Sequence, residues 1–325
     1  MDLFSAYERE FKTSLEKFMI EKSPKNLYTP MSYLIQLGGK RIRPFLCLMS
    51  AEAFGVIPNK AIGAALSVEV FHNFTLMHDD IMDSASLRRG KATVHRKWDI
   101  NTAILAGDAM LIRAYQSLEV YPTDIFENLT KLLSKTAIQL CEGQQLDIDF
   151  ETQSLVSQNQ YEEMIRLKTA VLIGCALKMG AIVGYASKED TKAIYDFGVQ
   201  LGLAFQLQDD YLDAFGDQST FGKKIGGDIL ENKKTILYHL AIKKASAKQA
   251  DLLKSILKDN ITLRDEEKIS IVKGLFEDTG AKEATRLSIL NYADMAELQL
   301  EKLSISDNEK TKFRALKDWL INRKH

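Results

Sequence analysis

The sequence has few residues that interrupt helices, and those few are unevenly placed. All five prolines, at positions 24, 30, 44, 58 and 122, lie in the first part of the chain. The roughly 200 residues that follow keep every backbone N–H donor and therefore predict almost continuous helix. Strand-like alternation of apolar and polar residues is also almost absent. These absences exclude a β-rich fold.

The chain has few cysteines and almost no net charge. The three cysteines, Cys47, Cys141 and Cys175, are odd in number and lie among apolar neighbours. This pattern predicts buried thiols in a reducing compartment, with no disulfide framework or zinc site. The 43 lysines and arginines against 44 aspartates and glutamates leave a formal charge of -1. Composition therefore provides no electrostatic case for binding nucleic acid or an anionic membrane surface.

Targeting and membrane-spanning segments are also missing. The first residues lead into Glu8, Arg9 and Glu10 without the basic start or apolar core of a signal peptide. No uncharged run reaches the length that crosses a bilayer. We therefore expect a soluble, cytoplasmic protein with no transmembrane segment. No Gly/Ser/Pro-rich linker divides the chain, so we expect a single domain over residues 1–325.

Helical periodicity dominates what remains. Tyr7, Phe11 and Leu15 continue an i+4 stripe that begins at Leu3. The expected helices cover 2–20, 27–37, 42–54, 59–83, 101–119, 124–149, 159–183, 188–215, 232–244, 247–258, 265–278, 279–303 and 306–321, and the chief loops are 84–100 and 216–231. Helices 59–83 and 188–215 are apolar over most of their circumference, as central helices of a bundle are. The sequence predicts an all-α fold.

One acidic pattern occurs twice, as Asp79-Asp80-Ile81-Met82-Asp83 and as Asp209-Asp210-Tyr211-Leu212-Asp213. In a helix, the first and last aspartates of each copy lie on one face and concentrate negative charge there. A single such copy is most often a solvated surface stripe. Two copies, each ending an apolar helix at the negative end of its dipole, instead predict bound cations. Carboxylate oxygens suit Mg²⁺, which shares its remaining positions with water and a substrate phosphate.

Three basic, glycine-containing segments supply partners for phosphate. They are Gly38–Pro44, Leu87–Lys91 and Gly222–Asp228, the last followed by Lys233 and Thr235. Arginine forks suit bidentate binding of phosphate oxygens, and glycine lets the backbone approach an anion closely. The chain thus carries enough positive groups for two diphosphates, one bound through metals and one through cations alone.

From about Gly38 to Thr235, the order of these motifs resembles the all-trans polyprenyl diphosphate synthase family, related to farnesyl and geranylgeranyl diphosphate synthases. The resemblance implies a homodimer of all-α barrels, the isoprenoid synthase fold, in which helices surround a deep central cavity. It implies a short-chain prenyltransferase that condenses isopentenyl diphosphate with dimethylallyl, geranyl or farnesyl diphosphate. It also implies about three Mg²⁺ ions per active site, which Mn²⁺ replaces in some cases.

The resemblance assigns roles residue by residue. The metal ligands would be Asp79, Asp80, Asp83, Asp209, Asp210 and Asp213. Contacts to the allylic diphosphate would come from Arg88, Lys168, Lys223 and Lys233. The isopentenyl diphosphate would be bound without metal by Lys40, Arg43, His72 and Arg89, although a histidine on an apolar helix is more often a core residue. Gln144 and Asp147 would line the allylic site, and Lys168, Thr169, Phe205 and Gln206 would flank the reacting carbons.

Product length should depend on side chains below the first motif. Phe74 lies five residues before Asp79, roughly 7.5 Å along the axis, and Phe71 lies one turn deeper. Both rings fit core positions as well as a cavity floor. By the resemblance, Phe74 followed by Thr75 favours geranylgeranyl diphosphate (C20) as the product. Farnesyl diphosphate (C15) is the alternative, if the Phe71 ring also closes the cavity.

Two other functions remain open. A terpene cyclase would also use an acidic motif with Mg²⁺, but it needs one diphosphate site, and Lys40, Arg43 and Arg89 supply a second. A non-catalytic subunit of a heteromeric synthase could dispense with metal ligands, whereas all six aspartates are present here.

Overall fold

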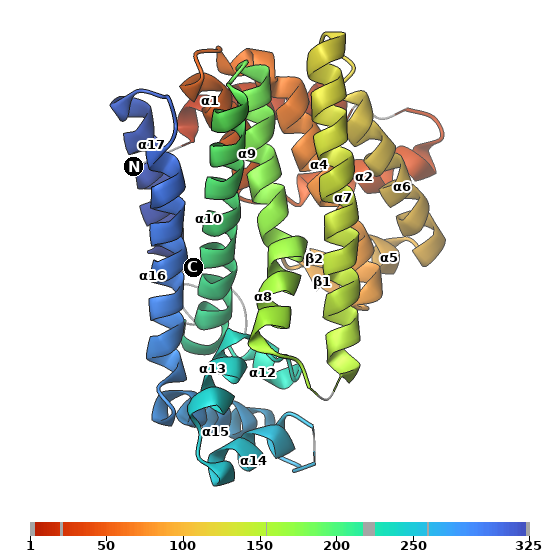
Figure 1. The fold of residues 1–325 in the computed structure, drawn as a ribbon. Coiled ribbons are helices and arrows are strands. Elements are labelled where there is room, and N and C mark those ends of the chain that lie inside the picture. Colours follow the sequence, from red (N-terminus) through yellow and green to blue (C-terminus); the bar gives the residue numbers. More distant parts are fainter. Residues whose placement is uncertain (1–3, 20–21, 154, 217–224, 259, 323–325) are drawn as a thin grey trace. The chain divides into compact units, whose positions relative to one another are not determined.

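The computed structural model describes residues 4–19, 22–153, 155–216, 225–258 and 260–322, and these residues form an all-α fold (Figure 1). Within them, the one strand pairing is an antiparallel hairpin of β1 (Leu87–Arg88) and β2 (Lys91–Ala92). None of the helices in these ranges combines the length and apolar character needed to cross a membrane. The predicted fold class is confirmed.

The chain forms two compact units. The first comprises Met1–Lys135 and Cys175–Lys192, and the second comprises Thr136–Gly174 and Ala193–His325. Three helices have residues in both: α7 (Thr123–Thr152), α9 (Val171–Val183) and α10 (Lys188–Phe215). The single domain over 1–325 and its deep central cavity stay predictions.

The first unit is built around α4 (Ile62–Met82), which is buried along most of its length. The other elements are α1 (Ser5–Phe18), α2 (Lys25–Gln36), α3 (Ile42–Ala53), the 3₁₀ helix η1 (Pro58–Ala61), α5 (Val94–Lys97) and α6 (Ile100–Gln116). α4 packs against α3 and α6. Phe11, Phe71 and Met110 are among the largest fully buried side chains of this core. An all-round apolar helix such as α4 needs neighbours on several sides, which is why it lies at the centre.

The second unit surrounds α13 (Ile236–Lys244), which contacts α8 (Gln158–Ile165), α14 (Ala247–Ile256), α15 (Asp265–Asp278) and α16 (Ala281–Glu301). It also contains the π-helix η2 (Arg166–Ala170), α12 (Gly227–Leu230) and α17 (Asp307–Ile321). Ser157 and Ser246 begin α8 and α14 with capping boxes, which satisfy the first backbone donors of each helix.

Several expectations differ from the structure in detail. The helix expected over 159–183 is interrupted by η2, and loop 84–100 contains the hairpin and α5. Loop 216–231 contains α12, and the helix expected from 232 begins at Ile236. The hairpin turns at Arg89 and Gly90, which both have positive φ, as a type I′ two-residue loop requires. Cys47 and Cys175 are buried as predicted, but Cys141 is exposed on α7. Leu140, its apolar neighbour in sequence, lies about 100° away around the helix and does not cover it.

Candidate active site

The first aspartate motif lies at the C-terminal end of α4, and one of its carboxylates is engaged by an arginine. Asp80 is 1% exposed. Nε of Arg88, on β1, donates to both Asp80 oxygens at 2.8 and 2.9 Å, and Nη2 lies 2.7 Å from Oδ1. The peptide N–H of Asp83 bonds the carbonyl of Asp79 at 2.8 Å and closes the helix. The structure therefore pairs a predicted metal ligand with a predicted diphosphate contact.

Arg41, Arg43 and Arg89, which lie outside α4, form a cationic cluster near His72 and Glu69, about two to three turns before Asp80 on α4. Nη1 of Arg43 lies 3.2 Å from Nε2 of His72. Burial, followed by the charge of Arg43, lowers the pKa of His72 well below its usual value, so the imidazole is neutral near pH 7. The Arg89 guanidinium lies so close to Gly39 that a Cβ there would be 2.6 Å from Nη2, and Gly39 has a φ of +131°. Glycine is needed here because a side chain would displace the guanidinium.

A buried carboxylate balances this cluster. Glu69 is 5% exposed, and Asn73 Nδ2 donates to its Oε1 at 3.2 Å. Burial raises the pKa of Glu69, while Arg41, Arg43 and Arg89 act to lower it. Sequence reasoning missed Glu69 and Asn73, because a single acidic residue within an apolar helix gives no motif.

The second aspartate motif lies near the C-terminal end of α10 in the second unit. Asp210 is 5% exposed, accepts a hydrogen bond from the Tyr161 hydroxyl and a second from Gln206 Nε2 at 3.1 Å. Burial, and then the negative charge of Asp228, raise the pKa of Asp210 to about 7. Asp213 Oδ2 accepts from the backbone N–H of Asp228 at 3.0 Å. This is a crowded group of carboxylates whose repulsion a cation would relieve.

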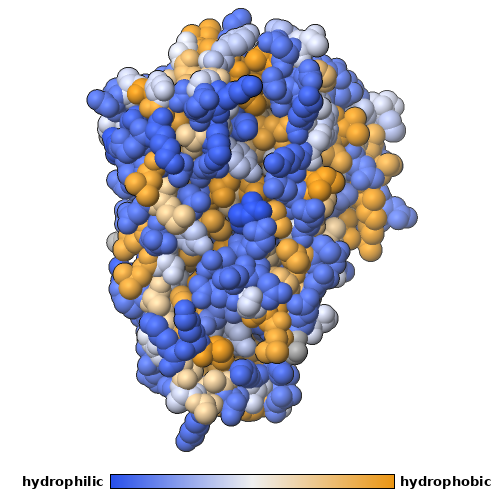
Figure 2. All heavy atoms as spheres, in the orientation of Figure 1, coloured by the Kyte–Doolittle hydropathy of each residue, from blue (hydrophilic) through white to orange (hydrophobic). Residues whose placement is uncertain are grey.

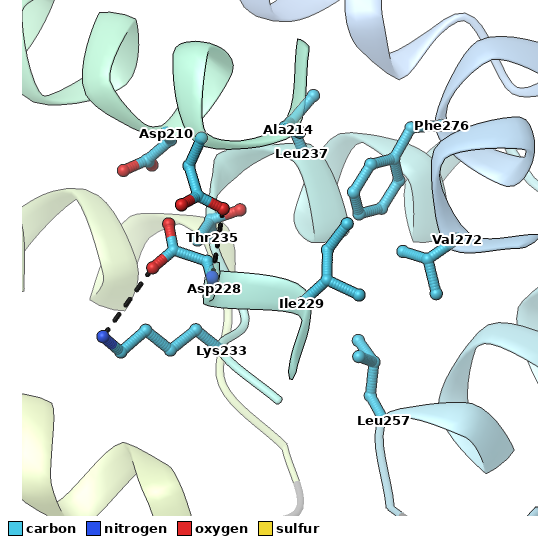
Figure 3. A pocket seen from close by; sticks show the side chains of 11 residues that line it. Asp210, Ala214, Asp228, Ile229, Lys233, Thr235, Leu237, Leu257, Val272 and Phe276 are labelled. Carbon is cyan, nitrogen blue, oxygen red and sulfur yellow. Dashed lines mark hydrogen bonds and ion pairs between the residues drawn. The ribbon is translucent and has the colours of Figure 1, made fainter. Parts of the chain in front are cut away.

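A small cavity lies beside these carboxylates (Figure 3). Asp210, Asp228 and Lys233 lie at one end of it, and Leu257, Val272 and Phe276 line the other. Lys233 Nζ is 2.6 Å from Glu231 Oε2 and 3.7 Å from Asp228 Oδ1. Burial acts to lower the pKa of Lys233, but Glu231 and Asp228 together raise it above its usual value.

The π-helix η2 presents Lys168 and Thr169 on adjacent positions. Lys168 Nζ lies 2.5 Å from Asp147 Oδ2, and Thr169 Oγ1 donates to Gln206 Oε1 at 3.0 Å. α7 approaches η2 so closely that a Cβ at Gly143 would lie 2.4 Å from the backbone nitrogen of Lys168. Single-turn π segments are frequent at functional sites. The structure thus joins Asp147, Lys168, Thr169 and Gln206, which are four predicted site residues.

The remaining predicted site residues differ in how exposed they are. The Gln144 Nε2 atom is buried and has no hydrogen-bond partner. Lys40 is exposed, Phe71 is 1% exposed and Phe74 is half-buried. Lys223 lies outside the described residues. Sequence reasoning also missed Tyr161 and Asp228, although Asp228 ends the basic segment 222–228 and could have been counted with the acidic groups.

The donor set fits a hard cation whose coordination is shared with a ligand. Among the residues that the structure describes, no three acidic, histidine or cysteine side chains lie close enough to hold a metal by themselves. Mg²⁺ is usually bound by one or two carboxylates, with water and substrate phosphate in the other positions. The buried Asp210 and its acidic neighbours meet that requirement.

Comparisons with known proteins give a consistent result. The model of the family described as polyprenyl synthetase matches residues 24–277. A short chain isoprenyl diphosphate synthase of Methanothermobacter thermautotrophicus is 36% identical, over 100% of this chain and 99% of the relative. A geranylgeranyl pyrophosphate synthase of Geoglobus acetivorans is 38% identical, over 96% and 95%.

Solved structures agree with these relatives. A crystal structure of a geranylgeranyl pyrophosphate synthase is similar with a TM-score of 0.93 and 50% identity, over 97% of each chain. A geranylgeranyl pyrophosphate synthetase from Pyrococcus horikoshii has a TM-score of 0.91 and 32% identity, over 99% of this chain and 98% of that one.

Proposed function

This chain belongs to the polyprenyl synthetase family, and on that premise we infer that it is a short-chain trans-prenyltransferase with a C20 product. It condenses isopentenyl diphosphate with an allylic diphosphate. The observation that carries the assignment of sites is the separation of charge along α4. Its C-terminal end carries Asp79, Asp80 and Asp83, and about two turns earlier His72 meets Arg43. One helix therefore offers separate environments for a metal-bound diphosphate and for a metal-free one.

We propose that the six motif aspartates bind Mg²⁺ on the allylic diphosphate, with Asp228 as an additional carboxylate. Mg²⁺, when bound, would neutralise the charge that develops on the departing diphosphate. Arg88, Lys168 and Lys233 add fixed positive charge to the same leaving group. Each of these cations has a carboxylate partner in the structure, so each is already oriented before substrate binds.

The hydroxyl of Thr169 is oriented to stabilise an allylic cation. Because its proton is donated to Gln206 Oε1, its oxygen lone pairs remain available on the other side. Gln206 is in turn fixed by its donation to Asp210. These neutral dipoles favour a nearby positive carbon without capturing it. The double bond of isopentenyl diphosphate then attacks, and we propose that the released diphosphate, rather than a side chain, removes the final proton.

The burial of the two phenylalanines supports Phe74 as the residue that limits product length. Phe71 is a fully buried core residue, and its ring centroid lies 5.5 Å from that of Phe74. Phe74 is half-buried and closer to the motif. We propose that the Phe74 ring is the floor on which the growing chain ends.

An exposed apolar face supports a homodimer. Ile100, Ile104, Leu105 and Ile112 on α6 are 53, 42, 60 and 59% exposed. Figure 2 shows apolar surface at the edge where Figure 1 places α6. Apolar patches of this kind mark protein interfaces. We propose that a second copy of the chain covers this face.

The test is incubation of the purified chain with Mg²⁺, isopentenyl diphosphate and each allylic primer in turn, followed by chromatography of the products. We expect the chain to extend the primers to products that end at C20. Conversion of an allylic diphosphate without isopentenyl diphosphate would indicate a cyclase. No conversion of any primer would indicate a non-catalytic subunit.

A further inference from the structure

The imidazole of His78 on α4 fills the space that a side chain at Gly107 on α6 would occupy. Gly107 is buried, and a Cβ added to it would lie 2.2 Å from His78 Nε2 and 2.6 Å from His78 Cδ2. No real Cβ makes such a contact, and interiors packed at protein density offer little room for it. The imidazole therefore keeps its present position only because residue 107 has no side chain.

Two further contacts fix the imidazole against α6. Nε2 of His78 lies 3.2 Å from the carbonyl oxygen of Ile104, within hydrogen-bonding distance, and 3.9 Å from Asp108 Oδ1. These residues lie one turn before Gly107 and directly after it. Together with the absence of a side chain at Gly107, these contacts fix the position of the imidazole against α6.

The same imidazole packs edge-on against Phe74, one turn earlier on α4. The two ring centroids are 4.9 Å apart and the planes meet at 68°. Phe71, one turn before Phe74 on α4, also meets the Phe74 ring, with centroids 5.5 Å apart and planes at 54°. Tilted and edge-to-face pairs at these distances are the favoured arrangements of aromatic rings. His78 and Phe71 thus hold Phe74 between them.

We propose that Gly107 and His78 are specificity-determining positioning residues, which set product length by holding the Phe74 ring in place. Gly107 leaves room for the His78 imidazole, and the imidazole restrains the Phe74 ring. The inference rests on the proposed function, because it requires Phe74 to be the floor for the growing chain. It adds that Gly107, on a neighbouring helix and outside the residues proposed to bind either diphosphate, controls where chain extension stops.

The experiment compares product distributions of His78→Ala, Gly107→Ala and the double variant, with isopentenyl diphosphate, farnesyl diphosphate and Mg²⁺. In His78→Ala the ratio of products longer than C20 to C20 should rise about fivefold, the change that corresponds to one aromatic pair of about 1 kcal/mol. Gly107→Ala should also lengthen the product, because its Cβ displaces the imidazole. In the His78→Ala background, Gly107→Ala should have no further effect, because the imidazole it would meet is gone.

Phe74→Ala separates this inference from the proposed function. If Phe74→Ala leaves product length unchanged, the proposed floor is wrong. If Phe74→Ala lengthens the product but His78→Ala and Gly107→Ala do not, the floor stands and the positioning role is overturned. Additive lengthening in His78→Ala/Phe74→Ala would also overturn it, because His78 would then act other than through Phe74. If Gly107→Ala fails to fold, His78→Ala and the double variants still decide the outcome.

Discussion

The guanidinium of Arg88 holds the carboxylate of Asp80 through contacts of 2.7 to 2.9 Å, so a proposed diphosphate contact neutralises a proposed metal ligand. Both groups belong to the first unit, and Asp80 is buried. Under the proposed function, Asp80 would hold Mg²⁺ and the Arg88 guanidinium would contact a phosphate oxygen of the allylic diphosphate. The pair would thus keep both groups oriented in the absence of substrate.

Arg88→Ala should therefore destabilise the metal-free protein. The variant leaves the Asp80 side chain, 2% exposed, without its counter-charge, which should cost about 3 kcal/mol of unfolding free energy. Mg²⁺ should restore part of that loss. The measurement is urea denaturation with and without Mg²⁺. As a control, Arg166→Ala breaks a pair with Glu163 whose side chains are 31 and 49% exposed, and should cost under about 1 kcal/mol. Equal losses in the two variants would contradict the account.

Gly143→Ala should damage the site through the backbone. Its Cβ would lie 2.4 Å from the Lys168 nitrogen and would push α7 away from η2. We expect turnover to fall at least about 10-fold and the melting temperature to drop, because small displacements of catalytic groups are costly. Gly274→Ala on α15 is the matched control, since a Cβ there meets nothing within 4 Å. It should be neutral or stabilising by up to about 1 kcal/mol. Similar behaviour of the two variants would refute the role of Gly143.

Tyr161→Phe should weaken metal-dependent binding. It removes the hydroxyl that donates to Asp210, and loss of such supporting contacts typically lowers metal affinity about 10- to 100-fold. Calorimetric titration with Mg²⁺ and a non-reactive allylic diphosphate analogue measures the change. Tyr238→Phe is the control, because both tyrosine rings pack on His239 but Tyr161 is the one that reaches Asp210. The prediction is wrong if the two variants bind equally well.

His239 should make stability depend on pH. Burial lowers its pKa from 6.5 to about 4. Between pH 4 and 6.5 the unfolded chain binds a proton at this histidine that the folded chain does not. The free energy of unfolding is therefore unaffected by the titration of His239 above pH 6.5 and decreases as the pH falls toward 4. Chemical denaturation at pH 4.5 and 7 should show a smaller difference for His239→Gln than for the wild type. Parallel pH profiles would contradict this.

The sequence predicted the elements whose signal is long and repeated. The helix before Asp79 and the helix that carries Asp209 were found because apolar residues recur over many turns. The π-helix at Lys168–Thr169 could not be found that way, because it changes the period for a single turn. Its position reflects the approach of α7 at Gly143, which is a tertiary contact.

Site residues could be predicted from the sequence where charged residues form a motif. They could not be predicted where a single residue acts through a contact that only folding creates. The aspartate motifs and basic segments repeat or cluster in the sequence. Tyr161 and Glu69 do not, and their roles appear only when folding brings them to Asp210 and to the arginine cluster. The pairing of Arg88 with Asp80 is likewise a product of the hairpin, which turns at Arg89 and Gly90 and carries Arg88 toward the end of α4.

The turnover of Asp79→Ala shows most directly whether the aspartate motifs bind Mg²⁺ on the leaving diphosphate. The measurement is the steady-state rate of chain extension with saturating isopentenyl diphosphate, allylic diphosphate and Mg²⁺. The rate should fall at least about 100-fold, since the departing diphosphate would lose neutralising charge in the transition state. A rate near that of the wild type would contradict this role of the aspartates.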